Sequence, residues 1–230
     1  MNILCAGAVQ GVIKAIEDAF FKSTGEKVNA RFGSVGVMKE ALLAGEPCDV
    51  MIVTAAMTAA LQRESKLMIG SEASVGRVRV GIAVPKGAPL PDISTPEALK
   101  ARLLAAGAIY FPETQRATAG IHFATVLAEL GIAEEVSGRL YTFPSGAMVM
   151  RELGASTEPD AIGCTQITEI NYTPGVTLVG PLPKAFELAT VYTAAVSVTT
   201  SNPMLAHRFV GWVTGPESRA LREQGGFEFT

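Results

Sequence analysis

The stretch that decides the fold runs from Phe32 to Val53 and reads FGSVGVMKEALLAGEPCDVMIV. It contains a glycine-bracketed turn, a helical pattern from Val37 to Leu43 and an apolar strand pattern, DVMIVT, over residues 49–54. A further strand pattern, VNARF, leads into the turn. Strand, turn, helix and strand in this order are typical of an α/β domain with a largely parallel sheet.

The same alternation continues on both sides of this stretch. Before it, NILCA predicts a strand and residues 12–22 predict an amphipathic helix, with five apolar residues at helical spacing. These are Val12, Ala15, Ile16, Ala19 and Phe20. After it, AIYFPE, LYTFPS and AIGCTQI predict strands, separated by helices over residues 119–130 and 146–153. The predicted fold class is therefore α/β, with mixed, mostly parallel sheets.

Two segments have the character of crossings between lobes. VGRVRVGIAVPKG is an alternating strand that runs into a Pro/Gly segment, and VYTAAVSVTTSNP is a second alternating strand late in the chain. We predict a discontinuous first lobe, residues 1–82 with 190–230, and a second lobe, residues 83–189. The second lobe opens with a helix that Thr95 caps and Pro96 begins.

Composition excludes several classes of protein. Of the 230 residues, 48% are hydrophobic and 18% charged, and the net charge is -3, so the chain lacks the basic field that nucleic acid requires. No apolar run reaches the roughly 20 residues that span a bilayer, so we expect no membrane insertion. The N-terminal residues lack the pattern of a secretory signal, which predicts a cytoplasmic protein as written, or a periplasmic one if a signal has been removed.

Cysteine and histidine usage argues against a metal site. Cys5, Cys48 and Cys164 form no CxxC pair, and His122 and His207 are isolated in the sequence. We expect neither a metal nor a cofactor.

Over nearly its whole length the chain resembles type II periplasmic solute-binding proteins, and the molybdate-binding branch is the most similar. The likeness rests on FGSVG, GEPCDVMIV, GIAVPKG, DISTPEALK and NPMLAHRFVGWVTGPESRALREQGGFE, in this order. It implies a two-lobed clamp, commonly monomeric, that closes by hinge bending on a small ligand in an interlobe cleft. It also implies delivery of that ligand to an ABC permease.

Several predicted helices begin at small or polar loop residues, where unpaired backbone N–H groups and the helix dipole favour an anion. Ser34 and Ser145 can act there as ligand donors, as helix N-caps, or as both. The candidate ligand-binding residues are Gly7, Ala8, Val9, Ser34, Val35, Thr54, Arg116, Thr118, Ser145 and Gln166.

Departures from the molybdate-binding pattern favour an organic carboxylate as the ligand. Ala8 stands where relatives place a serine, Val35 follows Ser34 where a second serine is usual, and CTQ (residues 164–166) stands near the place of a tyrosine. Arg116 can hold a carboxylate through two hydrogen bonds, or it can pair with Glu113 as a solvated loop residue.

Two other functions stay open beside the binding protein, which is the favoured interpretation. The fold family includes a branch resembling aconitate isomerase, and a proton-transferring isomerase of a di- or tricarboxylate would use His122 or Glu113 as its base. The same clamp also serves as an effector-sensing domain in bacterial regulators.

Overall fold

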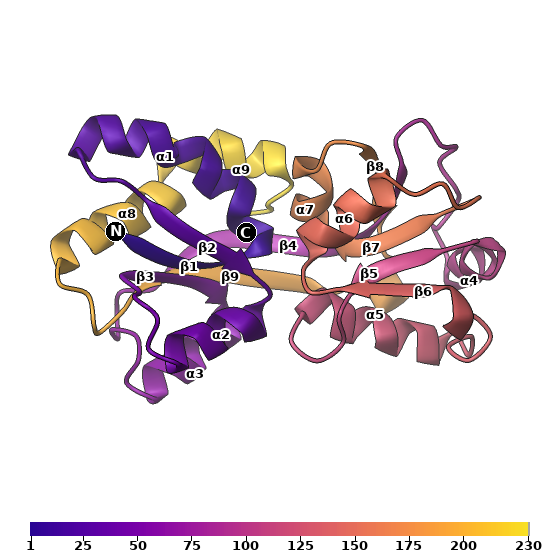
Figure 1. Ribbon diagram of the computed structural model, residues 1–230, viewed down its shortest axis with the longest axis horizontal. Helices are drawn as coiled ribbons and strands as arrows, with labels where there is room; N and C mark the ends of the chain where they lie inside the picture. Colours follow the sequence, from indigo (N-terminus) through magenta and orange to yellow (C-terminus); the bar gives the residue numbers. More distant parts are fainter. Residues whose placement is uncertain (230) are drawn as a thin grey trace. The chain divides into compact units, whose positions relative to one another are not determined.

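The computed structural model describes residues 1–229 and contains two compact units (Figure 1). Unit 1 consists of Met1–Val78 with the C-terminal segment from Thr190, and unit 2 is Arg79–Ala189. Each unit has its own sheet covered by helices on both faces, which is the layered α/β arrangement that the alternating sequence pattern predicts.

In unit 1 three parallel strands lie side by side and one antiparallel strand extends the sheet. β1 pairs in parallel with β2 and β3, and β9 runs antiparallel to β3. Their bounds are β1 (Asn2–Ala6), β2 (Asn29–Gly33), β3 (Val50–Thr54) and β9 (Ala189–Val196). β1 and β3 are buried almost throughout, as expected for parallel strands covered on both faces.

Helices cover both faces of the unit 1 sheet. α1 packs with α8 and α9, while α2 and α3 lie across the sheet from them (Figure 1). The bounds are α1 (Gln10–Thr24), α2 (Val35–Leu43), α3 (Ala55–Arg63), α8 (Pro203–Thr214) and α9 (Arg219–Gly225). Short 3-10 turns precede α1 (Gly7–Val9) and α9 (Pro216–Ser218).

The sheet of unit 2 is mixed. β5 pairs in parallel with β6 and β7, whereas β4 runs antiparallel to both β7 and β8. The bounds are β4 (Ala73–Pro85), β5 (Ile109–Pro112), β6 (Leu140–Phe143), β7 (Ile162–Gln166) and β8 (Val176–Pro181).

Unit 2 has a hydrophobic core on each face of its sheet. The larger core joins Ile82, Phe111 and Phe123 to the helices α4 and α5, and the smaller joins Tyr110 and Met150 to α6 and α7. The helix bounds are α4 (Pro96–Ala105), α5 (Thr118–Glu129), α6 (Gly146–Gly154) and α7 (Ile167–Tyr172). Two 3-10 turns, Ser137–Arg139 and Lys184–Phe186, complete the unit.

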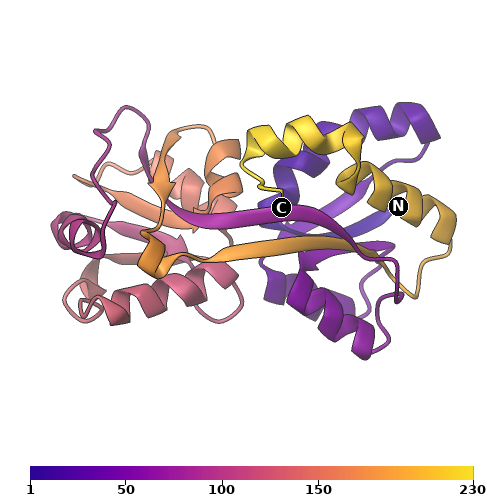
Figure 2. The ribbon, with the colours of Figure 1, turned by 180° about the vertical axis from the view of Figure 1, so that it is seen from behind.

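The chain passes from unit 1 to unit 2 within β4 and returns at the start of β9, which can be followed in Figure 2. The predicted fold class, α/β with mixed, mostly parallel sheets and two crossing strands, is confirmed. No helix within residues 1–229 has the length and apolar character needed to cross a membrane.

The predicted start of α4, which depends only on residues within one helical turn, is confirmed. The Thr95 side chain accepts a hydrogen bond from the Ala98 N–H, and Pro96 begins α4, as predicted. The helix predicted from Val37 begins at Val35, because Ser34 already has the extended backbone of an N-cap.

The predicted face of the first helix needs a correction. Ala15 and Ala19 are exposed, and Ile13 is fully buried in their place. The buried stripe is therefore narrower than predicted and is centred on the large apolar side chains. α3, α7 and β8 were not predicted.

Candidate functional site

In unit 1 the carboxyl ends of β2, β1 and β3 lie side by side, and each leads directly into a helix. Ala6 pairs with Gly33 in the register of β1 and β2, so the residues that follow these two strands are neighbours. We call this set of strand ends the unit-1 edge: Gly7, Ala8, Val9, Ser34, Val35 and Thr54. In open α/β sheets, ligands bind at such carboxyl ends.

The Ser34 side chain is the polar group of the unit-1 edge that makes no hydrogen bond within the described residues. It occupies the N-cap of α2 and is only 7% exposed, yet its hydroxyl has no hydrogen-bond partner among residues 1–229 and does not cap the helix. Buried polar atoms are almost always hydrogen-bonded, and an unsatisfied one costs roughly 1 to 3 kcal/mol. A ligand oxygen would satisfy both the hydroxyl and the open first turn of α2.

The other members of the unit-1 edge present backbone or an occupied hydroxyl. Gly7, Ala8 and Val9 are buried in their 3-10 turn, and Val35 is 7% exposed, so they can offer N–H groups and not side chains. The Thr54 hydroxyl accepts the Met57 N–H at 3.2 Å and thereby caps α3. Its own O–H remains able to donate to a ligand.

In unit 2 the carboxyl ends of β5, β6 and β7 form the corresponding set. We call the residues that follow them the unit-2 edge: Glu113, Arg116, Thr118, Ser145 and Gln166. β5 lies between the other two strands, so its loop is flanked by the starts of α6 and α7.

Gln166 is the counterpart of Ser34 in unit 2. It is 3% exposed at the N-cap of α7, and neither atom of its side-chain amide has a partner within the described chain. The Thr168 hydroxyl, two residues later, is also buried and unpaired among residues 1–229. Because both amide atoms are unpaired, this holds whichever way the amide is turned.

The start of α6 is already occupied by the protein's own groups. The Ser145 hydroxyl accepts the Met148 N–H at 3.4 Å, so the helix-cap interpretation of this serine is confirmed. The Glu169 carboxylate accepts the backbone N–H of Ala147 and also that of Gln166. Thr165 Oγ1 donates to Glu169 Oε2 at 2.6 Å.

Burial raises the pKa of Glu169 to about 7, and the hydrogen bonds from Thr165, Gln166 and Ala147 oppose this rise. A carboxyl group in this environment changes its protonation state near neutral pH. Sequence reasoning missed Glu169. Its signal was an acidic residue four positions after Thr165, between the two isoleucines of the segment ITEINY.

Arg116 and Glu113 interact with each other in the loop after β5. The Glu113 carboxylate accepts the backbone N–H groups of Gln115 and Arg116, and Arg116 Nε lies 3.4 Å from Glu113 Oε1. The Arg116 side chain is 43% exposed. Thr118 is half-buried and is the first residue of α5, one position earlier than predicted.

The two groups considered as bases from the sequence both have structural partners. His122 Nε2 lies 2.7 Å from the Phe186 carbonyl oxygen, and since a carbonyl can only accept, Nε2 carries the proton. Both oxygens of Glu113 accept backbone N–H groups. Cys164 is fully buried, and burial raises the pKa of its thiol, so no thiolate is available there.

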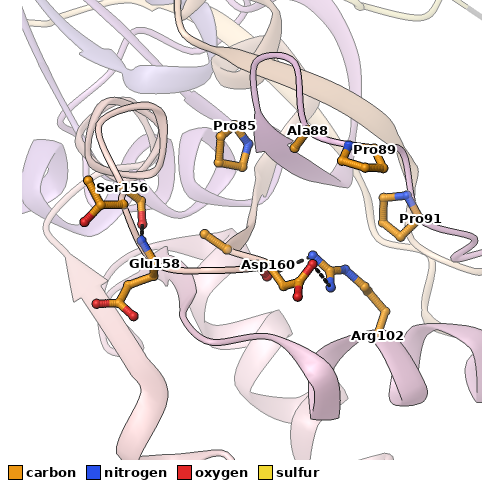
Figure 3. Close-up of a pocket in the computed structure, with 10 residues that line it drawn as sticks. Pro85, Ala88, Pro89, Pro91, Arg102, Ser156, Glu158 and Asp160 are labelled. Carbon is orange, nitrogen blue, oxygen red and sulfur yellow. Dashed lines mark hydrogen bonds and ion pairs between the residues drawn. The ribbon is translucent and has the colours of Figure 1, made fainter.

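A pocket of about 360 Å³ lies elsewhere in unit 2, at the amino end of β7 (Figure 3). Pro85, Pro89 and Pro91 form one side, and Arg102 lies opposite with Asp160. Arg102 Nη2 donates to the Asp160 carbonyl at 2.8 Å, and Nη1 lies 3.3 Å from the Asp160 carboxylate. The cation is therefore neutralised within the pocket, which makes this a poor anion site.

The family model of the bacterial extracellular solute-binding proteins matches residues 1–228. The chain therefore belongs to this family, and the resemblance predicted from the sequence is confirmed.

Individual relatives give further detail. The chain is 25% identical over 237 residues to an aconitate isomerase from a Pseudomonas species, covering 99% of this chain and 87% of that protein. Among solved structures, it is similar to the periplasmic molybdate-binding protein of Azotobacter vinelandii, with 18% identity, a TM-score of 0.83 and coverage of 100% and 99% of the two chains. The sulfate-binding protein SubI of Mycobacterium tuberculosis has 16% identity and a TM-score of 0.77, with coverage of 99% and 85%.

Proposed function

We propose that the protein binds a small anion at the unit-1 and unit-2 edges, favours an organic carboxylate over a molybdate-type oxyanion, and delivers it to an ABC-type transporter. The observation that carries this proposal is the pair of buried, unpartnered side chains Ser34 and Gln166. Ser34 directly follows β2 and Gln166 is the last residue of β7, so both lie at the carboxyl ends of strands, where α/β proteins bind ligands. A ligand would give each of them the partner it lacks within residues 1–229.

The preference for a carboxylate rests first on Gln166. Its amide has both an unpaired N–H donor and an unpaired carbonyl acceptor among the described residues. A tetrahedral oxyanion that is fully ionised presents only acceptors, so it would leave the carbonyl unsatisfied. A hydroxy acid or a partly protonated di- or tricarboxylic acid presents both kinds of group and fits the amide better.

The loss of two hydroxyl positions relative to the molybdate-binding pattern also favours a carboxylate. Ala8 and Val35 are buried apolar residues, while the hydroxyls of Thr54 and Ser145 accept backbone N–H groups and keep their own O–H donors. Ser34 is left as the unpaired hydroxyl of the unit-1 edge within the described chain. With Ala8 and Val35 in place of two serines, the unit-1 edge has fewer side-chain hydroxyls than the molybdate-binding pattern implies.

Favourable charge for an anion comes from helix starts and from Arg116. α2 and α5 each begin without a side-chain cap from their N-cap residues, Ser34 and Ala117, in the described structure. Their first-turn N–H groups carry the positive end of the helix dipole. The Arg116 guanidinium, which is 43% exposed and paired with Glu113, adds a cation beside the start of α5.

Family membership supports the transport role, and the solved relatives named for molybdate and sulfate support an anionic ligand. Closure on the ligand by hinge bending, a monomeric state and a partner permease stay predictions, as does a periplasmic location.

The direct test is a binding screen. Thermal shift and calorimetry would compare succinate, malate, citrate and both aconitate isomers with molybdate, tungstate, sulfate and phosphate. A ligand at about one hundred times its Kd stabilises the folded state by roughly 2.7 kcal/mol, a shift of several degrees in Tm. Carboxylate binding supports the proposal, and shifts with molybdate and tungstate alone would refute the preference.

Gln166→Met tests the site itself, because methionine has a similar shape and no amide. We expect carboxylate binding to weaken at least tenfold while the protein stays folded. Gln224→Met, at an exposed position in unit 1, is the matched control and should bind as the parent does. Unchanged affinity in Gln166→Met would exclude this amide from the site.

A second candidate function is isomerisation of a small di- or tricarboxylate on the same scaffold. The similarity to an aconitate isomerase over 99% of the chain favours it. His122, with its proton fixed on Nε2 by Phe186, has Nδ1 as its basic atom, whereas Glu113 is engaged by backbone donors. Interconversion of the aconitate isomers, followed by chromatography, with loss of activity in His122→Gln, would support this function. Binding without turnover would refute it.

A further inference from the structure

The carboxyl group of Glu169 lies at the start of α6, in the place that a bound anion would take. The Glu169 carboxylate accepts the Ala147 N–H of the first turn, and the Ser145 hydroxyl takes the Met148 N–H. Two of the donors that a helix start offers to a ligand are therefore in use. A bound anion at the unit-2 edge has a second negative group as its neighbour whenever Glu169 is ionised.

We propose that Glu169 is a specificity-determining residue of the unit-2 edge: it takes up a proton when an anion binds there, so that affinity for anions rises as the pH falls. This inference rests on the proposed function, because it needs an anion at that edge. Glu169 acts through electrostatic repulsion and through the Gln166 backbone and is not proposed to contact the ligand.

The geometry connects Glu169 to the proposed ligand contact. Glu169 accepts the backbone N–H of Gln166, the residue whose side-chain amide is buried and unpaired in the described chain. It also lies against Gly146, where a side chain would overlap Glu169 Oε2 and Thr165 Oγ1. The carboxyl group is thus enclosed between the start of α6 and the end of β7.

No charged group among residues 1–229 contributes to the shift in the pKa of Glu169. The arginines of β4 and of the loop after β5 each pair with a glutamate of their own: Arg77 with Glu228, Arg79 with Glu187 and Arg116 with Glu113. On α6, Arg151 and Glu152 are exposed to solvent, and on α7 the other titratable group is Tyr172, which is 36% exposed. β7 contributes the buried thiol of Cys164, and β8 has no titratable residue. The influences on the Glu169 carboxyl are burial and three hydrogen bonds, from Thr165, Gln166 and Ala147.

Repulsion between two negative groups in a poorly solvated environment favours the protonated form of the weaker acid. Burial already brings the pKa of Glu169 to about 7, so little additional repulsion is needed for proton uptake at neutral pH. By linkage, a group that gains one proton on binding makes Kd rise by up to tenfold for each pH unit above its unliganded pKa.

The test is calorimetric titration of the whole protein with malate and with sulfate at pH 6.5, 7.5 and 8.5. Two buffers of different ionisation heat report the protons taken up. We expect up to one proton taken up per ligand, and a Kd that rises several-fold to tenfold per pH unit between 7.5 and 8.5. Glu169→Gln should bind with no such dependence, whereas the exposed control Glu152→Gln should keep it.

The outcomes separate this inference from the proposed function. Binding without proton uptake, or an unchanged pH dependence in Glu169→Gln, overturns the role of Glu169 and leaves anion binding intact. Binding of neither probe, nor of any other anion in the screen, overturns both.

If Glu169→Gln fails to fold, Thr165→Val serves as the second variant. It removes the hydroxyl that donates to Glu169 Oε2 at 2.6 Å, which stabilises the ionised form. The pH at which affinity falls should then move upward, and an unmoved pH profile would overturn the inference.

Discussion

Gly146 and Glu169 fit against each other so closely that a side chain at position 146 would have to displace the Glu169 carboxyl group. A Cβ atom at Gly146 would overlap Glu169 Oε2 and Thr165 Oγ1. The absence of a side chain at the start of α6 is therefore what lets the carboxyl reach the Ala147 N–H. The two residues are far apart in sequence, so this relationship arises from the packing of α6 on α7.

Gly146→Ala should destabilise the protein by about 1 to 3 kcal/mol, because the added methyl group displaces Glu169 or the first turn of α6. Urea unfolding at pH 7 measures the effect. Gly211→Ala is the matched control, since Gly211 lies within α8 and a Cβ there meets nothing within 4 Å. The free energy of unfolding of the control should rise by up to about 1 kcal/mol, because alanine favours the helix more than glycine does. Equal effects of the two substitutions would contradict the close fit.

Glu169 should also give the stability of the protein a specific pH dependence. Its pKa is about 7 in the folded state, against an ordinary value of 4.5 for a glutamate, so between these pH values the folded state holds more protons than the unfolded state. The contribution of this group to the free energy of unfolding is then full below about pH 4.5 and is lost as the pH rises to about 7. The loss is on the order of 3 kcal/mol.

Urea unfolding at pH 5, 6, 7 and 8 checks this expectation by comparison with Glu169→Gln, which has no group to titrate. As the pH rises to about 7, the free energy of unfolding of the parent should fall relative to that of Glu169→Gln. Above that pH the difference between the two proteins should stay constant. Glu152→Gln, at an exposed position of α6, corrects for general charge effects. Parallel curves for the parent and Glu169→Gln would show that this carboxyl titrates normally.

Local sequence signals predicted most elements of the fold. They could not predict contacts between segments that are distant in the sequence. Thr95 and Pro96 mark a helix start through contacts within one turn, so the prediction needs no tertiary information. Ser34 could be placed at a helix start in the same way. Whether its hydroxyl finds a partner depends on distant segments, and the structure shows that it finds none within residues 1–229.

The candidate site was predicted less completely than the fold. Gln166 was found because it ends a strand, but the isolation of its amide became visible only in the packed structure. Glu169 was missed because α7 was not predicted from the sequence, and its burial depends on the start of α6 reaching it. The role of Arg116 in binding stays a prediction.

Ser34→Ala should separate a ligand contact from a helix cap. The Ser34 hydroxyl makes no hydrogen bond within the described chain, so its removal should leave the free energy of unfolding unchanged or slightly raised. Thr54→Ala is the comparison, because Thr54 accepts the Met57 N–H and its loss should cost about 1 kcal/mol. Chemical unfolding of both variants measures this contrast. A loss of 1 kcal/mol or more in Ser34→Ala would contradict it.

Arg116→Ala tests whether the cation beside α5 anchors the ligand. The side chain is 43% exposed and its ion pair with Glu113 is solvated, so stability should change by no more than about 0.5 kcal/mol. If Arg116 also holds a carboxylate, calorimetry should show malate binding weakened tenfold or more, since a hydrogen bond to a charged group is lost. Arg219→Ala removes an arginine from another exposed ion pair, in unit 1, and should bind malate normally. Malate affinity that is equal in both variants would assign Arg116 to the surface pair with Glu113 alone.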